Sequence, residues 1–292
     1  MAEGRGEPSC ATIRKRMSAT APSEKTSSQT RVPSRRLVLL GASNVARGIA
    51  SAVQAARSVF AGPFDLMAAL GHGRSYGRGS WVLGRWLPGI VDCQLWEDLA
   101  QRETCRADGG SSAPTQAFIT DVGNDILYGA SPEQIADWVR TCVERLREHR
   151  CDIALSGIPL ESLDRITSWE FPVFRTILYP GCFLTRQQAL DRAAKLNDRL
   201  ETLAADFELQ FIAPHADWYG RDRIHITRGR QLDAWGRFLQ GDETGETLTP
   251  STWGEFLAIR RLIPHERRLF GLKQGREQPA GVLQDGTRVS LY

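Results

Sequence analysis

The sequence has little of what metal, redox and membrane proteins require. Its six cysteines form no Cys-x-x-Cys pair and its five histidines are not clustered, so we expect neither a zinc site nor a thioredoxin-type motif. No run approaches the ~18 apolar residues of a membrane helix, and no apolar core follows the basic amino-terminal residues as in a secretory signal. We therefore expect a cytoplasmic protein with reduced thiols and without a metal, a cofactor or a membrane partner.

Net charge is also missing outside the amino-terminal segment. Residues 1–34 contain six basic and three acidic side chains, which accounts for the whole formal charge of +3, so the remaining residues are neutral. Nucleic-acid binding relies on a basic surface field. We expect no nucleic-acid partner.

Large apolar residues are scarce in residues 1–34, where only Ile13, Met17 and Val32 occur after Met1. Such a segment cannot bury enough surface to offset the entropy of its own ordering. The sequence therefore predicts a disordered basic tail at 1–34, an α/β domain at 35–240, and a carboxyl-terminal extension at 241–292 that packs on the same domain.

Beyond residue 35, short apolar runs alternate with amphipathic stretches. Residues 37–40 form a continuous apolar run, typical of a strand covered on both faces, and apolar residues at helical spacing follow it. Further strands are predicted at 65–70, 116–120, 152–156 and 208–213. Helices between the strands begin after the capping residues Ser131 and Thr185. This alternation predicts an α/β fold with a parallel sheet and helices on both faces.

Two regions carry weaker patterns. Between residues 78 and 113 we expect short helices that hold Trp81, Trp86 and Trp96. Near the carboxyl end we expect a helix at 251–263 and a β-hairpin at 282–291, because Asp-Gly stands at the centre of the latter segment.

Glycine-rich or polar turns follow the predicted strands. In a parallel sheet these turns meet at the carboxyl edge, which is where such folds bind ligands. They are the segments 41–44, 71–77, 121–125 and 215–225.

Three of these turns carry residues suited to acyl transfer. Ser43 lies between a strand and a helix, Asn124 follows another strand, and Asp222 precedes His225 by three residues. Alone, each has a simpler interpretation: a helix cap, an ordinary turn, or an incidental surface pair. Together they supply a nucleophile, an oxyanion donor, an orienting acid and a base, which is the set that acyl transfer needs.

With these four turns the chain resembles the SGNH (GDSL-type) serine hydrolase superfamily, over about residues 36–240. The four blocks of that superfamily match Gly-Ala-Ser-Asn at 41–44, Gly-His-Gly-Arg-Ser at 71–75, Gly-Asn-Asp at 123–125 and Asp-Arg-Ile-His at 222–225. The resemblance implies a flavodoxin-like three-layer α/β/α sandwich with five parallel strands.

The resemblance also implies a serine esterase that acts on acyl or acetyl esters of small molecules or carbohydrates. Ser43 would be the nucleophile, His225 the base and Asp222 the orienting acid. The oxyanion hole would be the backbone N–H groups of Ser43 and Gly73 with the Asn124 amide.

The chain departs from the family pattern at two positions. Ala42 replaces the usual aspartate before the nucleophile, and Val122 stands where the third block has glycine. Neither change removes a reacting atom. A catalytically silent binding protein on the same fold, or an acyltransferase, remains an alternative.

The substrate leaves a weaker signature. Arg74, Trp169 and Tyr179 are candidate substrate-binding residues, and further aromatic side chains accompany the last two at Phe171, Phe174 and Phe183. A packed cover over the core is the other interpretation of these aromatics.

A short-chain dehydrogenase also begins with an apolar strand, a glycine turn and a helix. Its phosphate-binding turn needs glycines where this chain has Val45 and Arg47. Its active site needs Tyr-x-x-x-Lys, whereas Asp191 precedes Lys195 and Leu269 precedes Lys273. An NAD(P)-binding dehydrogenase is therefore the less favoured alternative.

Overall fold

The computed structural model describes residues 1, 33–60, 62–107, 113–240 and 253–292. Apart from residues 1, 33 and 34, the tail predicted at 1–34 lies outside them. Among the described residues, no helix combines the length and the apolar character needed to cross a bilayer.

The centre of the fold is a parallel sheet in which the two strands β1 (Arg35–Leu40) and β2 (Phe64–Ala69) are almost wholly buried, as their apolar sequences predict. Its five predicted strands are present and pair in the order β2-β1-β5-β6-β7. They are β1 (Arg35–Leu40), β2 (Phe64–Ala69), β5 (Thr115–Ile119), β6 (Asp152–Ser156) and β7 (Gln210–Ile212). The α/β class with a parallel sheet is confirmed.

The sheet has seven strands rather than the five predicted. The hairpin expected near the carboxyl end forms from β10 (Gly281–Val282) and β11 (Arg288–Leu291), and β11 pairs parallel with β2. These strands cover the edge of β2, which would otherwise present unpaired backbone groups. The sequence did not indicate this pairing, because it joins segments far apart in the chain.

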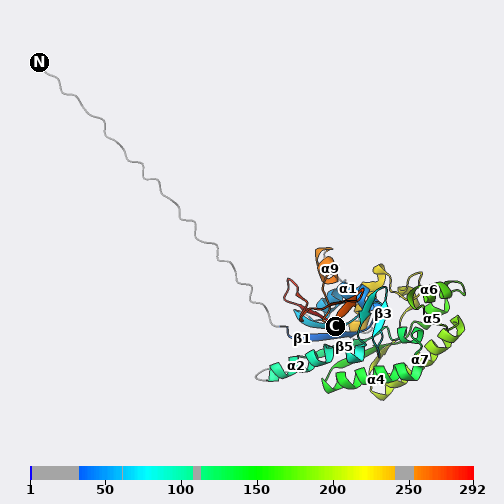
Figure 1. Cartoon of the computed structure of the whole chain (residues 1–292). Coiled ribbons are helices and arrows are strands. Elements are labelled where there is room, and N and C mark those ends of the chain that lie inside the picture. Colours follow the sequence, from blue (N-terminus) through cyan, green and yellow to red (C-terminus); the bar gives the residue numbers. More distant parts are fainter. Residues whose placement is uncertain (2–32, 61, 108–112, 241–252) are drawn as a thin grey trace. The chain divides into compact units, whose positions relative to one another are not determined.

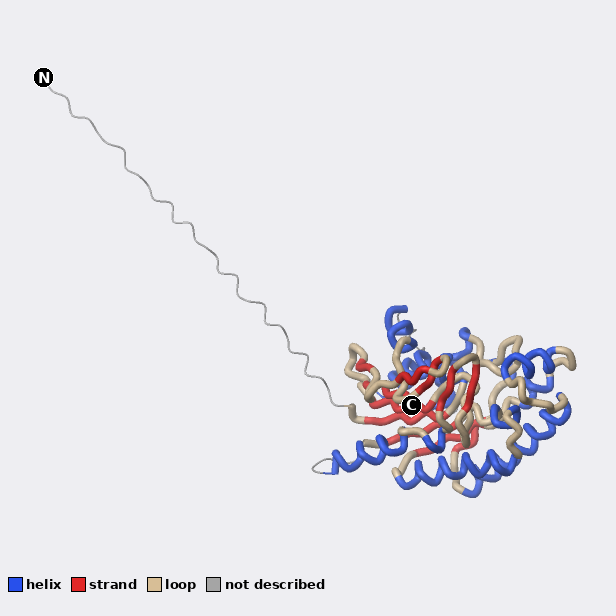
Figure 2. Tube along the Cα trace, viewed as in Figure 1, coloured by secondary structure: helices blue, strands red, loops and turns tan. Residues whose placement is uncertain are grey.

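Helices cover both faces of the sheet, which gives three layers (Figures 1 and 2). One face packs on α1 (Ser43–Phe60), α8 (Gln231–Gln240) and α9 (Trp253–Arg260). The other packs on α2 (Leu95–Ala107), α4 (Pro132–Glu148) and α7 (Arg186–Asp206). Alternate residues of β1 enter the two cores, with Leu37 and Leu39 on one side and Val38 and Leu40 on the other.

The predicted helix starts agree with the structure. Ser131 and Thr185 cap α4 and α7 through their side-chain oxygens, and Thr185 forms a full capping box with Gln188. Shorter helices lie in the connections between strands and helices. They are α3 (Asn124–Leu127), α5 (Leu160–Asp164), α6 (Glu170–Leu178) and three single turns, η1 (Ile90–Asp92), η2 (Ala216–Trp218) and η3 (Arg228–Arg230).

A second sheet consists of four short strands, which pair in the order β3-β4-β8-β9. Its strands are β3 (Ser80–Val82), β4 (Arg85–Leu87), β8 (Arg267–Leu269) and β9 (Leu272–Gln274). The prediction that Trp81 and Trp86 lie on short helices is therefore wrong, whereas Trp96 does lie on a helix, α2. Strands of three residues are too short to display a period of two in the sequence.

Candidate active site

The turns that follow the central strands converge at the carboxyl edge of the sheet, as predicted. Hydrogen bonds join the turn after β1 to the turn after β5 and to the loop that carries His225. A further bond, from Asn124 Nδ2 to the Arg74 carbonyl at 3.4 Å, joins the turn after β5 to the turn after β2. Four segments remote in sequence therefore form one site.

Asp121 anchors the turn that carries Ser43. It has a positive φ of 58°, and its carboxylate accepts hydrogen bonds from the backbone N–H groups of Ala42 at 3.0 Å and Asn44 at 2.8 Å, with Val45 further away at 3.4 Å. An anion at a helix amino terminus is stabilised by these free donors and by the helix dipole.

The carboxylate of Asp121 leaves one donor of this turn open. The Ser43 N–H has no acceptor among the described residues, and the same is true of the Ser43 hydroxyl. Ser43 is the first residue of α1 and lines a pocket. Its backbone N–H is thus available to an oxygen atom of a bound molecule.

Asn44 connects the serine turn to the histidine loop. Its side-chain amide donates to Asp121 Oδ1 at 2.7 Å and to the Ile224 carbonyl at 3.0 Å, and its Oδ1 accepts from Ile226 N–H at 2.8 Å. Both residues that flank His225 are therefore fixed to the residue that follows Ser43. Neither Asp121 nor Asn44 was singled out by the sequence, where both belong to motifs whose other members carry the chemistry.

Asp222 and His225 form a hydrogen-bonded pair, as their spacing predicts. Asp222 Oδ2 lies 2.8 Å from His225 Nδ1, while Oδ1 accepts from the His225 backbone N–H at 3.1 Å. Partial burial acts to raise the pKa of Asp222, but the hydrogen bonds from His225 and Ile224 outweigh it and hold the pKa below its ordinary value. A charged Asp222 places the ring proton on Nδ1 and leaves the Nε2 lone pair free to accept a proton.

Gly73 and Asn124 lie on neighbouring turns, which the hydrogen bond from Asn124 to the Arg74 carbonyl joins. Gly73 has a φ of 62°, and a Cβ at this position would lie 2.4 Å from Val82 Cγ2, so the turn requires glycine. The Tyr128 hydroxyl donates to the Gly73 carbonyl at 2.7 Å. Asn124 lines the pocket and its amide donates to the carbonyl of Arg74, the residue after Gly73, whereas Gly73 does not line the pocket.

Asp125 holds the loop that contains Gly73. Its buried carboxylate accepts from the Ser75 hydroxyl and from the Tyr76 backbone N–H at 2.8 Å. Burial raises the pKa of Asp125 to about 6, against the opposing effect of these two hydrogen bonds. Of the adjacent residues Asn124 and Asp125, the first thus lines the pocket and the second fixes the loop that contains Gly73.

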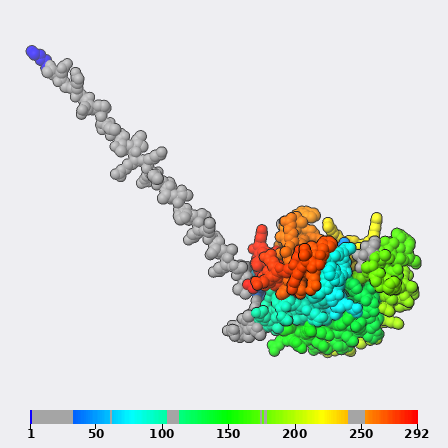
Figure 3. Space-filling view, in the orientation of Figure 1, coloured from blue at the N-terminus to red at the C-terminus, as the bar shows by residue number. Residues whose placement is uncertain are grey.

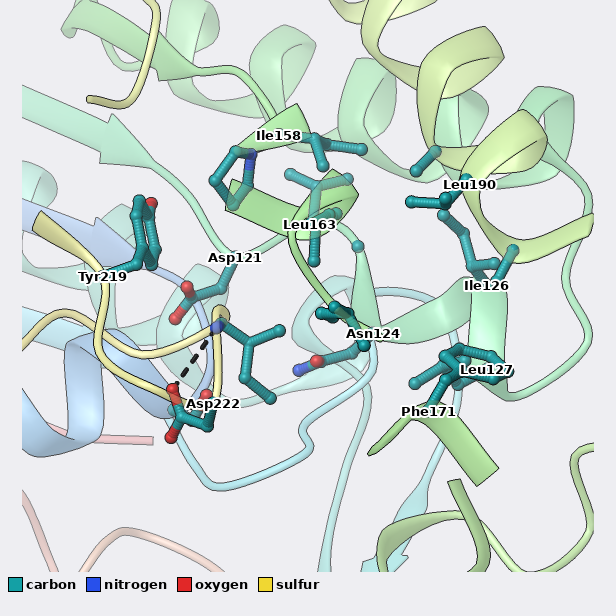
Figure 4. A pocket seen from close by; sticks show the side chains of 18 of the residues that line it. Asp121, Asn124, Ile126, Leu127, Ile158, Leu163, Phe171, Leu190, Tyr219 and Asp222 are labelled. Carbon is teal, nitrogen blue, oxygen red and sulfur yellow. Dashed lines mark hydrogen bonds between the residues drawn. The ribbon is translucent and has the colours of Figure 1, made fainter. Parts of the chain in front are cut away.

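A pocket of about 160 Å³ extends from Ser43 toward α7. Figure 4 shows polar side chains at one end, among them Asp121, Asn124 and Asp222, and apolar side chains at the other. The apolar part is lined by Ile126, Leu127, Ile158, Leu163, Phe171 and Leu190. The arrangement suits a ligand with a polar group at the serine and an apolar chain beyond it.

The candidate substrate residues are distributed differently from the prediction. Tyr179 lines the pocket, as does Phe171, whereas Trp169 is 71% exposed and does not line it. Arg74 is fully buried, and its guanidinium donates to the carbonyls of Pro88 and Leu70 and to the Tyr292 backbone oxygen. Arg74 therefore fixes its own loop, at residues 71–77, to neighbouring backbone and does not line the pocket. The side chain of Phe174 lies outside the described residues.

The two departures from the family pattern have structural explanations. Ala42 is buried and donates its N–H to Asp121, so a carboxylate from the turn after β5 reaches this turn. Val122 is buried in the core below the turn. In the described parts of the chain, no group of three or more histidine, cysteine, aspartate or glutamate side chains is arranged to hold a metal ion.

No protein-family model matches the chain, and no curated protein matches it. Several solved structures do. The psychrotrophic esterase EstA from Pseudoalteromonas sp. is 13% identical, covering 70% of this chain and 94% of its own, with a TM-score of 0.44. A member of the lipolytic G-D-S-L family from Veillonella parvula is 12% identical over 73% of this chain and 100% of its own, with a TM-score of 0.41.

AlinE4, an SGNH-hydrolase family esterase, is 13% identical over 70% of this chain and 92% of its own, with a TM-score of 0.38. Solved structures of SGNH and G-D-S-L hydrolases are thus among those to which this chain is similar.

Proposed function

We propose that the chain is a serine esterase, with Ser43 as nucleophile, His225 as general base and Asp222 as the residue that orients the imidazole. One observation carries the proposal: the Asp222–His225 pair, joined at 2.8 Å, lies in a loop that Asn44 fastens directly to the turn of Ser43. A base oriented by an acid and held beside a serine is the arrangement that activates a hydroxyl nucleophile.

In the proposed reaction, His225 Nε2 accepts the Ser43 proton as Oγ attacks the ester carbonyl carbon. The tetrahedral intermediate then collapses, the C–O bond to the alcohol breaks, and His225 returns the proton to the leaving oxygen. Water attacks the acyl-enzyme by the same route and releases the acid. Asp222, which is charged at neutral pH, stabilises the imidazolium in both halves.

The negative oxygen of the intermediate would be bound by the Ser43 N–H, the Gly73 N–H and the Asn124 amide. The open N–H of Ser43 and the nearness of Asn124 to the Gly73 loop support this role. Loss of one such donor typically reduces turnover by ~10²–10³. The missing hydrogen bond between Ser43 Oγ and His225 agrees with unliganded enzymes, in which such bonds often form only with substrate.

The pocket suggests which part of the ester it takes. A cavity of ~150 Å³ with apolar walls holds a molecule about the size of benzene, and the pocket here is close to that volume, at about 160 Å³. The apolar part is only a portion of this volume, so we assign it to an acyl chain of at most roughly six carbons. The alcohol would leave toward the open side of the site.

The proposal is tested with a fluorophosphonate, which modifies only an activated serine, and with p-nitrophenyl hexanoate. Ser43→Ala is expected to abolish labelling and to reduce turnover by at least ~10⁴, because the nucleophile is lost. The adduct mass in the wild-type chain should map to Ser43.

Ser58→Ala is the matched control, since Ser58 lies on the same helix and its hydroxyl donates to the Ala55 carbonyl, its one hydrogen-bond partner within the described part of the chain. It should label and turn over normally. Full turnover in Ser43→Ala would contradict the assignment, and absence of labelling in the wild-type chain would favour a binding protein. Labelling without acid release would favour acyl transfer to another acceptor.

A further inference from the structure

The outer face of the second sheet carries a row of tryptophans and cations. Directly paired residues of neighbouring strands share one face of a sheet, and the register aligns Trp81, Trp86, Arg268 and Lys273 in this way. Trp81 is 51% exposed, and the Arg268 guanidinium lies 4.9 Å from the centre of the Trp86 ring. We call these four side chains the outer row.

Two hairpin tips project from the same sheet. Leu83-Gly84 joins β3 to β4, Phe270-Gly271 joins β8 to β9, and all four residues have positive φ, from 47° to 86°. Such two-residue turns normally take Asn-Gly, because bulky side chains are strained in this conformation. The Phe270 N–H donates to the Gly84 carbonyl at 2.7 Å, so the tips lie side by side.

Both tips expose apolar side chains to solvent. Leu83 is 72% exposed and Phe270 is 78% exposed, and Leu272 next to the second tip is also exposed. Each tip therefore combines a strained backbone with a large apolar group in water, two unfavourable features that asparagine would remove. Backbone strain of this kind is commonly associated with function.

The sheet is also the site of concentrated positive charge in a chain that is neutral beyond residue 34. Residues 80–87 and 267–274 contain four cations and no acidic residue. Glu266 borders the sheet, 3.4 Å from Lys273 Nζ. Among the described residues, the other three cations, Arg85, Arg267 and Arg268, have no acidic partner. The register places Arg268 on the face of the outer row, whereas Arg85 and Arg267 lie at the opposite face of the sheet.

We propose that this surface docks the protein onto an anionic lipid bilayer. Leu83 and Phe270 would enter the headgroup region, with the outer row at the membrane surface. Tryptophan and long cationic side chains are the residues that favour this interface, since each has an apolar body and a polar end. Basic residues bind anionic headgroups at about 1 kcal/mol each.

A bilayer fits these observations better than an acidic protein does. Projecting tips enter a fluid phase without a shaped cavity to receive them, whereas a protein partner would need such a cavity. The docking is peripheral and requires no spanning helix, so the absence of long apolar runs, which led us to expect no membrane partner, does not bear on it.

The inner face of the sheet links this surface to the site at the sheet edge. Val82 packs against Gly73, and a Cβ on Gly71 would lie 2.1 Å from Leu87 Cδ1. In Figure 3 the orange segment that contains β8 and β9 lies against the cyan segment that contains β3 and β4. In the docked state, the second sheet would therefore lie between the Gly73 loop and the lipid. This arrangement does not depend on whether the chain is an esterase.

The test is flotation of the full chain with vesicles of phosphatidylcholine alone or with phosphatidylglycerol added, at low salt. Wild type should float with the anionic vesicles and detach as salt is raised. Leu83→Asn combined with Phe270→Asn should weaken this binding by at least about tenfold, as should Arg268→Gln combined with Lys273→Gln. Asparagine suits the left-handed conformation, so the first double variant keeps the turns.

The matched controls are Phe183→Asn, an exposed apolar residue before α7, and Lys195→Gln, an exposed cation on α7. Both should float like wild type. The proposal is overturned if wild type ignores anionic vesicles, or if the two double variants float as well as the controls. It is also overturned if wild type binds soluble polyglutamate or dimerises through these tips, by light scattering, without binding vesicles.

Discussion

Asp121 shows how a single side chain can set the geometry of a turn. Its carboxylate gathers the N–H groups of Ala42, Asn44 and Val45 and omits that of Ser43. The turn is thereby fixed while one donor stays free. The aspartate that the SGNH pattern has before the serine is absent here, and a carboxylate from another strand end bonds the turn.

Asp121→Ala is expected to lower the free energy of unfolding by ~2 kcal/mol, because charge-assisted bonds at a helix amino terminus are lost. It should also reduce kcat by at least ~10-fold, because Ser43 is no longer held in place. Asp121→Asn keeps one acceptor oxygen, so its free energy of unfolding and its kcat should lie between those of the wild type and of Asp121→Ala. Urea unfolding and ester turnover measure these effects.

Asp137→Ala serves as the control for this substitution, since Asp137 is an exposed carboxylate on α4. It should leave both quantities unchanged. An Asp121→Ala variant with wild-type kcat would show that the turn holds its shape without the carboxylate.

Asp125 predicts a pH dependence of stability. Its pKa is about 6 in the folded protein against an ordinary value of 3.8, so the folded state holds the proton more tightly than the unfolded state. The stability that this proton contributes is present below pH 3.8 and is lost as pH rises toward 6. The loss should reach about 2–3 kcal/mol by pH 7.

Asp125→Asn cannot titrate at this position. Urea unfolding of wild type and variant at pH 4, 5, 6 and 7 should give curves that diverge, with the wild type declining more steeply. Parallel curves would mean that the Asp125 carboxyl ionises in the folded protein as easily as in water.

At the scale of elements, the second sheet is the part of the fold that the sequence did not predict. Its strands have three residues each, and two of them are separated from the other two by most of the chain. Their turns are also atypical, since Leu-Gly and Phe-Gly stand where Asn-Gly would have predicted a hairpin. By contrast, the Asp-Gly turn between β10 and β11 was recognisable from its sequence.

Leu83→Asn is expected to raise the free energy of unfolding by about 1 kcal/mol, because asparagine tolerates a positive φ and leucine does not. Phe270→Asn should act in the same direction. Val173→Asn on α6 is the control: Val173 is also exposed, but asparagine brings no gain in a helix. Urea unfolding compares the three, and a loss of stability in Leu83→Asn would contradict the strain at this tip.

At the scale of the molecule, the sequence was informative wherever a pattern is local. The central strands are continuous apolar runs, the helices carry apolar stripes such as that of Ile135, Val139 and Leu146, and the acid and base are three residues apart. Contacts between distant segments were not predictable. Asn44 reaches a loop 180 residues away, and the burial of Arg74 depends on strands that follow it late in the chain.

One of these distant contacts has a consequence for how the chain acquires its shape. The Tyr292 N–H donates to Ala68, at the end of β2, and its backbone oxygen accepts from Arg74, 218 positions earlier. During synthesis, β2 and the loop of Gly73 leave the ribosome long before β11 exists to cover them. We expect the nascent chain to carry an open sheet edge, and an Arg74 side chain that lacks one of its acceptors, until this closure. The interval is then a period of vulnerability to aggregation and a step at which chaperones would act.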